Sequence, residues 1–226
     1  MKKGIIFDMD GTLWDSAENV AKSWVVALEK CGITDCPVTK EDMYRVMGKT
    51  MDKIAEILFP FCQGEERAHL LEMCCDVEND YLREHGGQLY PKLRETMEIL
   101  KDTYHLYIVS NCQAGYIEAF LDYYGFHDLF EDIECFGNND KPKGENIRLI
   151  VERNELDAAV YVGDIQGDYE ATTEAGLPFI HARYGFGTIE DEVPFINALE
   201  DLPEVVKTVS ISISMHMANT VSGSLI

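Results

Sequence analysis

Five short, mostly apolar runs, separated by amphipathic helical patterns, constrain the fold of this chain more than any other feature. Such alternation is typical of a parallel β-sheet, because parallel strands need long connections that are usually helices. Strands without a polar face are expected to be buried on both sides. We therefore predict an α/β fold. The expected strands are residues 4–7, 106–109, 133–136, 159–162 and 178–181.

The chain between the first two expected strands has a different character. Residues 16–86 contain apolar residues at helical spacing and no convincing strand. Ser16 is expected to cap the first helix, and Thr39 with Asp42 forms a capping-box pattern at the start of another. This segment is therefore expected to be a helical domain inserted into the α/β fold.

These patterns divide the chain into three parts. An α/β core is expected to comprise residues 1–15 and 87–206, with residues 16–86 as the inserted helical domain. A C-terminal tail follows at residues 207–226. The tail begins with an alternation of Ser and Ile that resembles an exposed strand, but it has no expected partner strand. Its structure is left open.

Charge and cysteine content exclude several classes of partner. The chain has 19 Lys and Arg against 41 Asp and Glu, a formal net charge of −22. Nucleic acid and anionic lipid both bind basic surfaces, so neither is an expected partner. The seven cysteines are odd in number and irregularly spaced. This pattern indicates reduced thiols in a cytoplasmic protein.

Two further features agree with a cytoplasmic location. No apolar stretch approaches the roughly 20 residues needed to span a bilayer. The apolar run before Asp8 is too short for the core of a signal peptide. Oligomeric state has no signature in the sequence.

Reactive polar side chains follow several of the expected strands. Because the carboxyl ends of parallel strands meet at one edge of a sheet, and ligands bind there, these side chains are expected to lie close together. They are Asp8 and Asp10 after the first strand, Ser110 and Asn111 after the second, Lys141 and Lys143 after the third, and Asp164 and Asp168 after the fourth.

Electrostatics indicates what this edge binds. Two carboxylates about 4 Å apart repel each other by roughly 4 kcal/mol at an effective dielectric constant near 20. Several converging carboxylates therefore require a cation or protonation. Oxygen ligands without His or Cys favour a hard ion such as Mg²⁺. A lysine and a hydroxyl group at the same edge favour a phosphoryl group as the ligand.

With these residues the chain resembles the haloacid dehalogenase-like hydrolase superfamily, in its phosphatase branch with a helical C1-type cap, which includes the phosphoglycolate phosphatases. The resemblance extends over roughly residues 3–200. It implies a Rossmann-like sheet of order 5-4-1-2-3 and a helical cap over the site. The motifs that carry it are Asp8-Met9-Asp10-Gly11-Thr12-Leu13, Ser110-Asn111, a Lys before a helix, and Gly163-Asp164-Ile165-Gln166-Gly167-Asp168.

The resemblance implies a Mg²⁺-dependent hydrolysis of a small phosphorylated metabolite. Asp8 would be the nucleophile that forms an aspartyl-phosphate, and Asp10 the general acid and base. Ser110 and Asn111 would bind phosphoryl oxygens. The Mg²⁺ ligands would be the carboxylates of Asp8 and Asp164, the backbone carbonyl of Asp10, and Asp168 directly or through water.

Two lysines compete for the role of neutralising the phosphoryl charge. Lys141-Pro142 resembles the motif of phosphoglycolate phosphatase-like members, whereas Lys143-Gly144-Glu145 resembles that of phosphoserine phosphatase-like members. We favour Lys143, because it immediately precedes a helix expected to begin near Glu145.

Two other functions stay open at this point. A phosphomutase of the β-phosphoglucomutase type uses the same paired aspartates and cap. More remotely, a receiver-like binding module also has a phosphate-accepting aspartate, Mg²⁺, a hydroxyl residue and a lysine. In the helical segment, Arg45 or Lys49 is a candidate contact for the distal end of a substrate.

Overall fold

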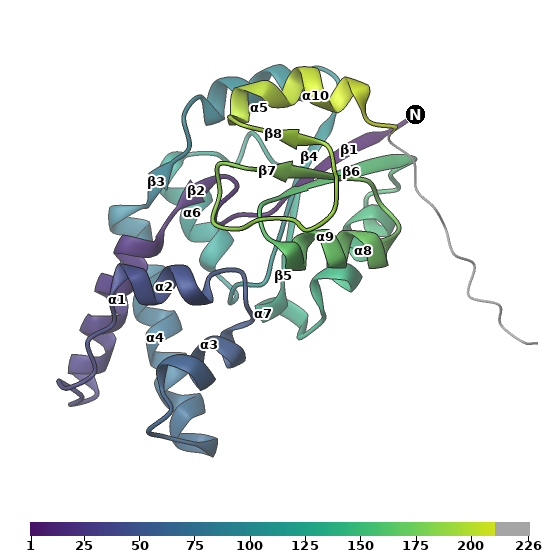
Figure 1. Cartoon of the computed structure of the whole chain (residues 1–226). Helices are drawn as coiled ribbons and strands as arrows, with labels where there is room; N and C mark the ends of the chain where they lie inside the picture. Colours follow the sequence, from purple (N-terminus) through teal and green to yellow (C-terminus); the bar gives the residue numbers. More distant parts are fainter. Residues whose placement is uncertain (211–226) are drawn as a thin grey trace, which may run out of the picture.

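A parallel sheet forms the centre of the computed structural model, which describes residues 1–210 (Figure 1). Its strand order is β5-β4-β1-β6-β7-β8, and every neighbouring pair is parallel. The central strand, β1, thus lies between β4 and β6. The strands are β1 (Lys3–Phe7), β4 (His105–Ser110), β5 (Asp132–Cys135), β6 (Ala158–Gly163), β7 (Phe179–Ala182) and β8 (Phe195–Ile196).

The predicted α/β fold is confirmed, and all five expected strands form within one or two residues of their predicted positions. In chain order these five lie as 3-2-1-4-5, which is the expected 5-4-1-2-3 order read from the other edge. The prediction missed β8, which adds two residues at the edge beside β7. It also placed Phe136 in a strand, whereas Phe136 begins the short helix α7 (Phe136–Asn139).

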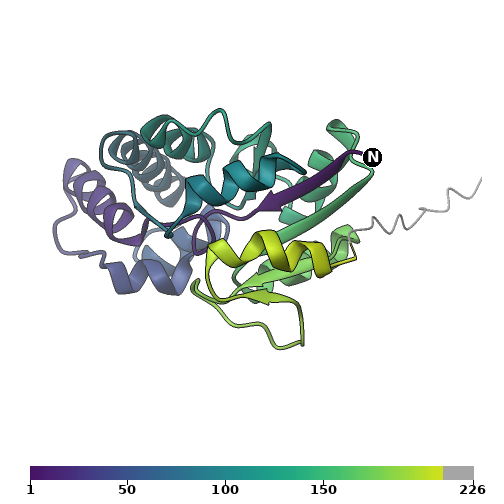
Figure 2. The same cartoon turned by 90° about the horizontal axis from the view of Figure 1, so that it is seen from above.

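Helices cover both faces of the sheet (Figure 2). Successive residues of β1 point to opposite faces, so that Ile5 and Phe7 belong to one apolar cluster and Ile6 to another; all three are fully buried. Besides helices from the segment between β2 (Trp14–Asp15) and β3 (Gln88–Leu89), the helices that contribute to the first cluster are α5 (Leu93–Lys101), α6 (Tyr116–Tyr124) and α10 (Leu202–Thr208). Those that contribute to the second are α8 (Lys143–Arg153) and α9 (Gln166–Ala175).

The four helices between β2 and β3 lie on the side of the sheet toward which β1 runs (Figure 1). We call them the helical insertion. They connect to the sheet through a short antiparallel pair, β2 (Trp14–Asp15) and β3 (Gln88–Leu89). The helices are α1 (Ala17–Lys30), α2 (Lys40–Val46), α3 (Met51–Leu58) and α4 (Gly64–His85).

The helical insertion packs through its own apolar residues and against α6. Trp24 of α1 stacks on Phe59, with ring centroids 5.4 Å apart, and both side chains are buried. The capping box predicted at the start of α2 is present: the Asp42 amide donates to Thr39 Oγ1 and the Thr39 amide to Asp42 Oδ2. These local signals were therefore sufficient to locate the helix start.

Two expectations concern the termini and the membrane. Residues 207 and 208 of the predicted tail belong to α10, while most of that tail lies outside the described residues. Among residues 1–210, no helix combines the length and the apolar character needed to cross a membrane. All seven cysteines lie in this part of the chain and are free thiols.

Candidate active site

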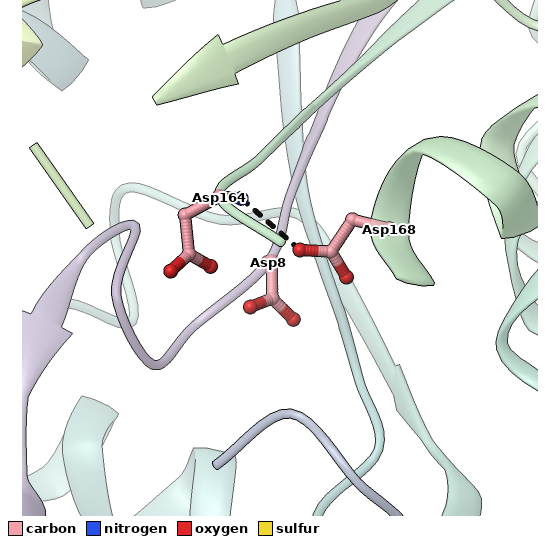
Figure 3. A group of neighbouring side chains, drawn as sticks. All are labelled: Asp8, Asp164 and Asp168. Carbon is pink, nitrogen blue, oxygen red and sulfur yellow. Dashed lines mark hydrogen bonds between the residues drawn. The ribbon is translucent and has the colours of Figure 1, made fainter. Parts of the chain in front are cut away.

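Three buried aspartates meet at the carboxyl end of the sheet. Asp8 directly follows β1, Asp164 directly follows the neighbouring β6, and Asp168 lies in the first turn of α9. One carboxylate oxygen from each lies within 4.8 Å of the other two (Figure 3). The backbone amide of Asp8 donates to the Val162 carbonyl at 2.8 Å, which fixes the two strand ends beside each other.

Lys143, the first residue of α8, contacts two of these aspartates. Its Nζ donates to Asp8 Oδ1 at 2.7 Å and to Asp168 Oδ1 at 2.6 Å, and its side chain is buried. Lys141 is exposed and makes no ion pair within residues 1–210. Of the two candidate lysines, only Lys143 thus reaches the carboxylates. The helix begins two residues earlier than predicted, so Lys143 lies in its first turn rather than before it.

Asp168 has a structural task as well as a place in the cluster. Its Oδ2 accepts hydrogen bonds from the backbone amides of Asp164 (3.1 Å) and Ile165 (3.2 Å), the first of which is drawn in Figure 3. Its Oδ1 accepts from Lys143. Both oxygens therefore already have partners from the chain, and Asp168 fixes the turn that presents Asp164.

Asp164 has one carboxylate oxygen without a partner. Its Oδ2 accepts from the Phe186 amide at 2.6 Å, whereas the buried Oδ1 has no hydrogen bond from any described residue. Burial, and then the neighbouring Asp168 and Asp8, raise the pKa of Asp164 well above its usual value. A buried acceptor without a partner is unfavourable unless a ligand satisfies it.

The charge on Asp8 is similarly unbalanced. Burial is the largest cause that raises its pKa from 3.8 to about 7; Asp168 also raises it, while Lys143 lowers it. Burial also lowers the pKa of Lys143, but Asp168 and Asp8 outweigh this effect and raise it well above its usual value. With three carboxylates against one ammonium group and only oxygen donors, the cluster fits a hard divalent ion such as Mg²⁺.

Gly11 allows the chain to pass close to this cluster. Its φ of +86° lies in the left-handed region, and a Cβ at this position would overlap the Asp164 carboxylate. Glycine is the residue that tolerates both the conformation and the close approach. The Asp8-Met9-Asp10-Gly11 motif thus has a steric reason as well as a chemical one.

The Asp10 side chain lies apart from the three clustered aspartates. Its Oδ1 accepts from the Ser16 hydroxyl at 2.7 Å and from the Tyr116 hydroxyl at 2.8 Å. Burial raises the pKa of Asp10 to about 6, and the hydrogen bonds from Ser16 and Tyr116 oppose that rise. The prediction for Ser16 is corrected here: its side chain makes no capping bond to α1, because it bonds to Asp10 instead.

The two residues after β4 have different surroundings. Ser110 is buried at the end of the strand and borders the same cavity as Asp8. Asn111 Nδ2 donates to the Gly48 carbonyl at 2.9 Å and so ties the sheet to the loop between α2 and α3. Its side-chain donor therefore contacts the helical insertion.

A cavity of about 40 Å³ lies between the carboxyl end of the sheet and the helical insertion. On the sheet side it is bordered by Asp8, Asp10 and Ser110, and on the other side by Lys49 and Glu78 among others. By this measure it has room for a few water molecules. Of the two candidate contacts in the insertion, exposed Lys49 borders the cavity, whereas Arg45 pairs with Asp42.

Sequence reasoning missed several residues of this site. Tyr116 carried no signal, because only the tertiary fold brings it to Asp10. Glu78 did carry one: it lies four residues after Cys74 and four before Leu82, on the apolar side of α4. A carboxyl group in that position is exceptional in a helix that packs on a core.

A parallel α/β sheet, an aspartate at the end of its central strand, a lysine beside it and a helical insertion after the first strand together define a class of hydrolase. The family model "Haloacid dehalogenase-like hydrolase" matches residues 5–182. The chain belongs to the haloacid dehalogenase-like hydrolase family. The predicted resemblance, and the expectation of an enzyme of this family, are confirmed.

Named relatives support the phosphatase branch. A phosphoglycolate phosphatase from Yersinia pestis is 27% identical over 195 residues, which cover 81% of this chain and 82% of that protein. One from Aquifex aeolicus is 27% identical over 196 residues, covering 84% and 89%. A crystal structure described as a predicted phosphatase from Clostridium acetobutylicum has the same fold, with a TM-score of 0.74, 22% identity, and coverage of 92% of this chain and all of that one.

Proposed function

We propose that this protein is a Mg²⁺-dependent phosphatase that hydrolyses a small phosphomonoester through an aspartyl-phosphate on Asp8. The observation that carries the proposal is the buried Asp8 carboxylate, which lies 2.7 Å from the Lys143 ammonium group and has a carboxylate oxygen within 4.8 Å of one from Asp164, a residue whose Oδ1 has no partner among the described residues. The relatives named as phosphoglycolate phosphatases support the same reaction class.

Asp8 is the nucleophile of the first step. Its carboxylate oxygen forms a bond to phosphorus while the bond from phosphorus to the ester oxygen breaks, and Asp10 gives a proton to the departing alcohol. Because Asp10 Oδ1 already accepts two hydrogen bonds, its other oxygen is the one available to carry that proton. A pKa of about 6 allows Asp10 to exchange a proton near neutral pH.

Water completes the reaction in the second step. Asp10 accepts a proton from the water molecule while the water oxygen bonds to phosphorus. At the same time the bond between phosphorus and the Asp8 oxygen breaks, which releases phosphate. Lys143 favours the ionised form of Asp8 and neutralises charge on the phosphoryl group. Buried Ser110, with Asn111 beside it, supplies donors to the phosphoryl oxygens.

The residues that would hold Mg²⁺ are the carboxylates of Asp8 and Asp164 and the backbone carbonyl of Asp10. Asp168 has both oxygens engaged, so we assign it to positioning Asp164 and Lys143, with any contact to the ion made through water. When bound, the ion offsets the negative charge of the carboxylates and of the phosphoryl group. The unpartnered Oδ1 of Asp164 is the acceptor in this cluster that most needs a ligand.

The helical insertion has the place of a cap in this proposal. We assign residues 16–86 to the cap domain and residues 1–15 and 87–206 to the core, since β2 and β3 form the paired connection between them. The expected partner is a small phosphorylated metabolite, without nucleic acid or membrane, in keeping with the net charge of −22. The free thiols favour a cytoplasmic location.

A phosphate-release screen over small phosphomonoesters, with Mg²⁺ or with a chelator, tests the proposal. We expect turnover that requires Mg²⁺ and that is lost in Asp8→Asn, a variant that removes the nucleophile with little change of shape. Turnover that persists in this variant would contradict the assignment of Asp8. Conversion of β-glucose 1-phosphate to glucose 6-phosphate would show that the protein is a phosphomutase. A stable phosphorylated protein without turnover would show that it is a binding module.

A further inference from the structure

A second buried carboxyl group faces the candidate site from the helical insertion. Glu78, on α4, is only 3% exposed and borders the same cavity as Asp8 and Ser110. It takes no part in the reaction proposed above. Its position on the far wall of the cavity is where the alcohol portion of a phosphomonoester would lie once the phosphoryl group is at Asp8.

Glu78 is held by neutral donors alone. The indole Nε1 of Trp24 donates to its Oε2, and Gln113 Nε2 donates to its Oε1 at 3.1 Å. No ion pair among residues 1–210 involves Glu78. Asp8 has Lys143 as a counter-charge, whereas the Glu78 carboxylate has none from the described chain. Each of its oxygens can accept a further hydrogen bond.

Gln113, on the loop between β4 and α6, provides an independent sign that the part of the cavity beside Glu78 needs a ligand. Its side-chain nitrogen donates to both Glu78 and Asn79, which fixes the orientation of the amide. The amide oxygen is left buried without a hydrogen-bond partner from any described residue, although Gln113 also borders the cavity. A buried carboxylate and a buried amide oxygen without a partner therefore lie next to each other at the border of the cavity, which makes this part of the border rich in acceptors.

We infer that Glu78 and Gln113 form a subsite for a hydrogen-bond donor, a hydroxyl or ammonium group, on the alcohol portion of the substrate. This inference rests on the proposed phosphatase function and narrows its substrate class. The phosphate esters of polyols or amino alcohols fit the subsite, because they donate to both acceptors. A phosphorylated carboxylic acid such as phosphoglycolate does not, because its carboxylate would face a second buried carboxylate.

Two charges near the subsite bear on this inference. Burial raises the pKa of Glu78 to about 7, while Trp24 and Gln113 lower it, so the carboxylate form predominates in mildly alkaline buffer. Lys49 also borders the cavity and could attract an acid, but its side chain is exposed and its charge is screened by water. The buried acceptors therefore outweigh it.

Three esters of matched size test the subsite directly. Phosphoglycolate, 2-hydroxyethyl phosphate and phosphoethanolamine each have a two-carbon alcohol portion, with a carboxylate, a hydroxyl or an ammonium group at its end. Ethyl phosphate, with no polar group there, is the reference. The wild-type protein with Mg²⁺ at about pH 8 should show kcat/KM at least about tenfold higher for the two donor esters than for phosphoglycolate.

Glu78→Gln keeps the shape of the side chain and removes its charge. It should lower kcat/KM for phosphoethanolamine by about tenfold and for 2-hydroxyethyl phosphate by less, while ethyl phosphate changes by less than about twofold. Glu84→Gln, on the same helix with a 79% exposed side chain, is the matched control and should change none of the four.

The outcomes separate this inference from the proposed function. If the wild-type protein prefers phosphoglycolate, or if Glu78→Gln slows all four esters equally, the subsite is refuted while the phosphatase assignment stands. If the screen over small phosphomonoesters finds no ester that is hydrolysed with Mg²⁺, both fail. The preference of the wild-type protein needs no variant, so poor folding of Glu78→Gln would not prevent a decision.

Discussion

Replacing Lys143 with methionine should destabilise the protein strongly, and more so at high pH. Lys143 lies 2.7 Å from Asp8 Oδ1 and 2.6 Å from Asp168 Oδ1, and all three side chains are buried. Removing one partner from a buried ion pair typically costs about 3–5 kcal/mol, because the remaining charge stays buried without compensation. We expect a loss of this size in the free energy of unfolding.

The pH dependence follows from the pKa of Asp8, which is about 7 with Lys143 in place. Without the ammonium group that pKa rises further. Below pH 7 Asp8 is protonated in the folded state of both proteins, so the variant loses less there. Above pH 7 each pH unit adds about 1.4 kcal/mol to the unfolding free energy that Lys143→Met loses. The loss should therefore be roughly 2 kcal/mol larger at about pH 8.5 than at about pH 5.5.

Urea unfolding in the presence of a chelator measures this effect at the two pH values. Lys141→Met is the matched control, because Lys141 is exposed and has no ion-pair partner within the described chain. Its unfolding free energy should change by less than about 0.5 kcal/mol. Equal effects of the two substitutions, or a Lys143→Met effect independent of pH, would refute the reasoning.

Three further predictions concern the aspartates. Tyr116→Phe removes a donor to Asp10 and should move the Asp10 limb of the pH–rate profile, expected near pH 6, up by about one unit; an unmoved limb would contradict this. Gly11→Ala should lower the unfolding free energy by about 2 kcal/mol and abolish Mg²⁺-stimulated turnover, because its Cβ would overlap Asp164; a normal denaturation curve would contradict this. In chelator, the free energy of unfolding should decrease as pH rises from the usual Asp pKa of 3.8 through about 7, because the folded state retains the Asp8 proton over this range. Mg²⁺ should therefore raise Tm more at about pH 8 than at about pH 6. A rise in Tm that is the same at both pH values would contradict this prediction.

The fold was largely predictable because its signals are local. Each buried strand is a short apolar run, and the polar residues Asp8, Ser110 and Asp164 mark where three of the runs end. The sequence did not indicate β8, because a two-residue strand has no periodicity. Phe136 was misplaced because an apolar residue after a strand looks like its continuation.

The site was predictable only as far as strand ends determine it. Because β1 and β6 are neighbours, Asp8 and Asp164 necessarily lie close together. The choice between Lys141 and Lys143 required the direction of the side chains, which a loop sequence does not fix. The prediction for Ser16 failed for a related reason. A serine before a helix resembles a cap, and the sequence does not show that its hydroxyl instead bonds to Asp10 and to Tyr116 of α6.

Contacts across the cavity were beyond the sequence for a further reason. The spacing of apolar residues predicts which face of α4 is buried, but not which element it faces. Glu78 could therefore be recognised as unusual, but its partner Gln113 lies on a loop 35 residues away in the chain. Only the placement of the helical insertion against the sheet brings the two together.

Chemical identification of the phosphorylated residue tests the central claim most directly. The protein is mixed with a hydrolysed phosphomonoester and Mg²⁺, quenched in acid within the first turnover, digested, and analysed by mass spectrometry. We predict a phosphoryl group on Asp8 in the wild-type protein and none in Asp8→Asn. A phosphoryl group on any other residue, or undiminished turnover by Asp8→Asn, would contradict the mechanism.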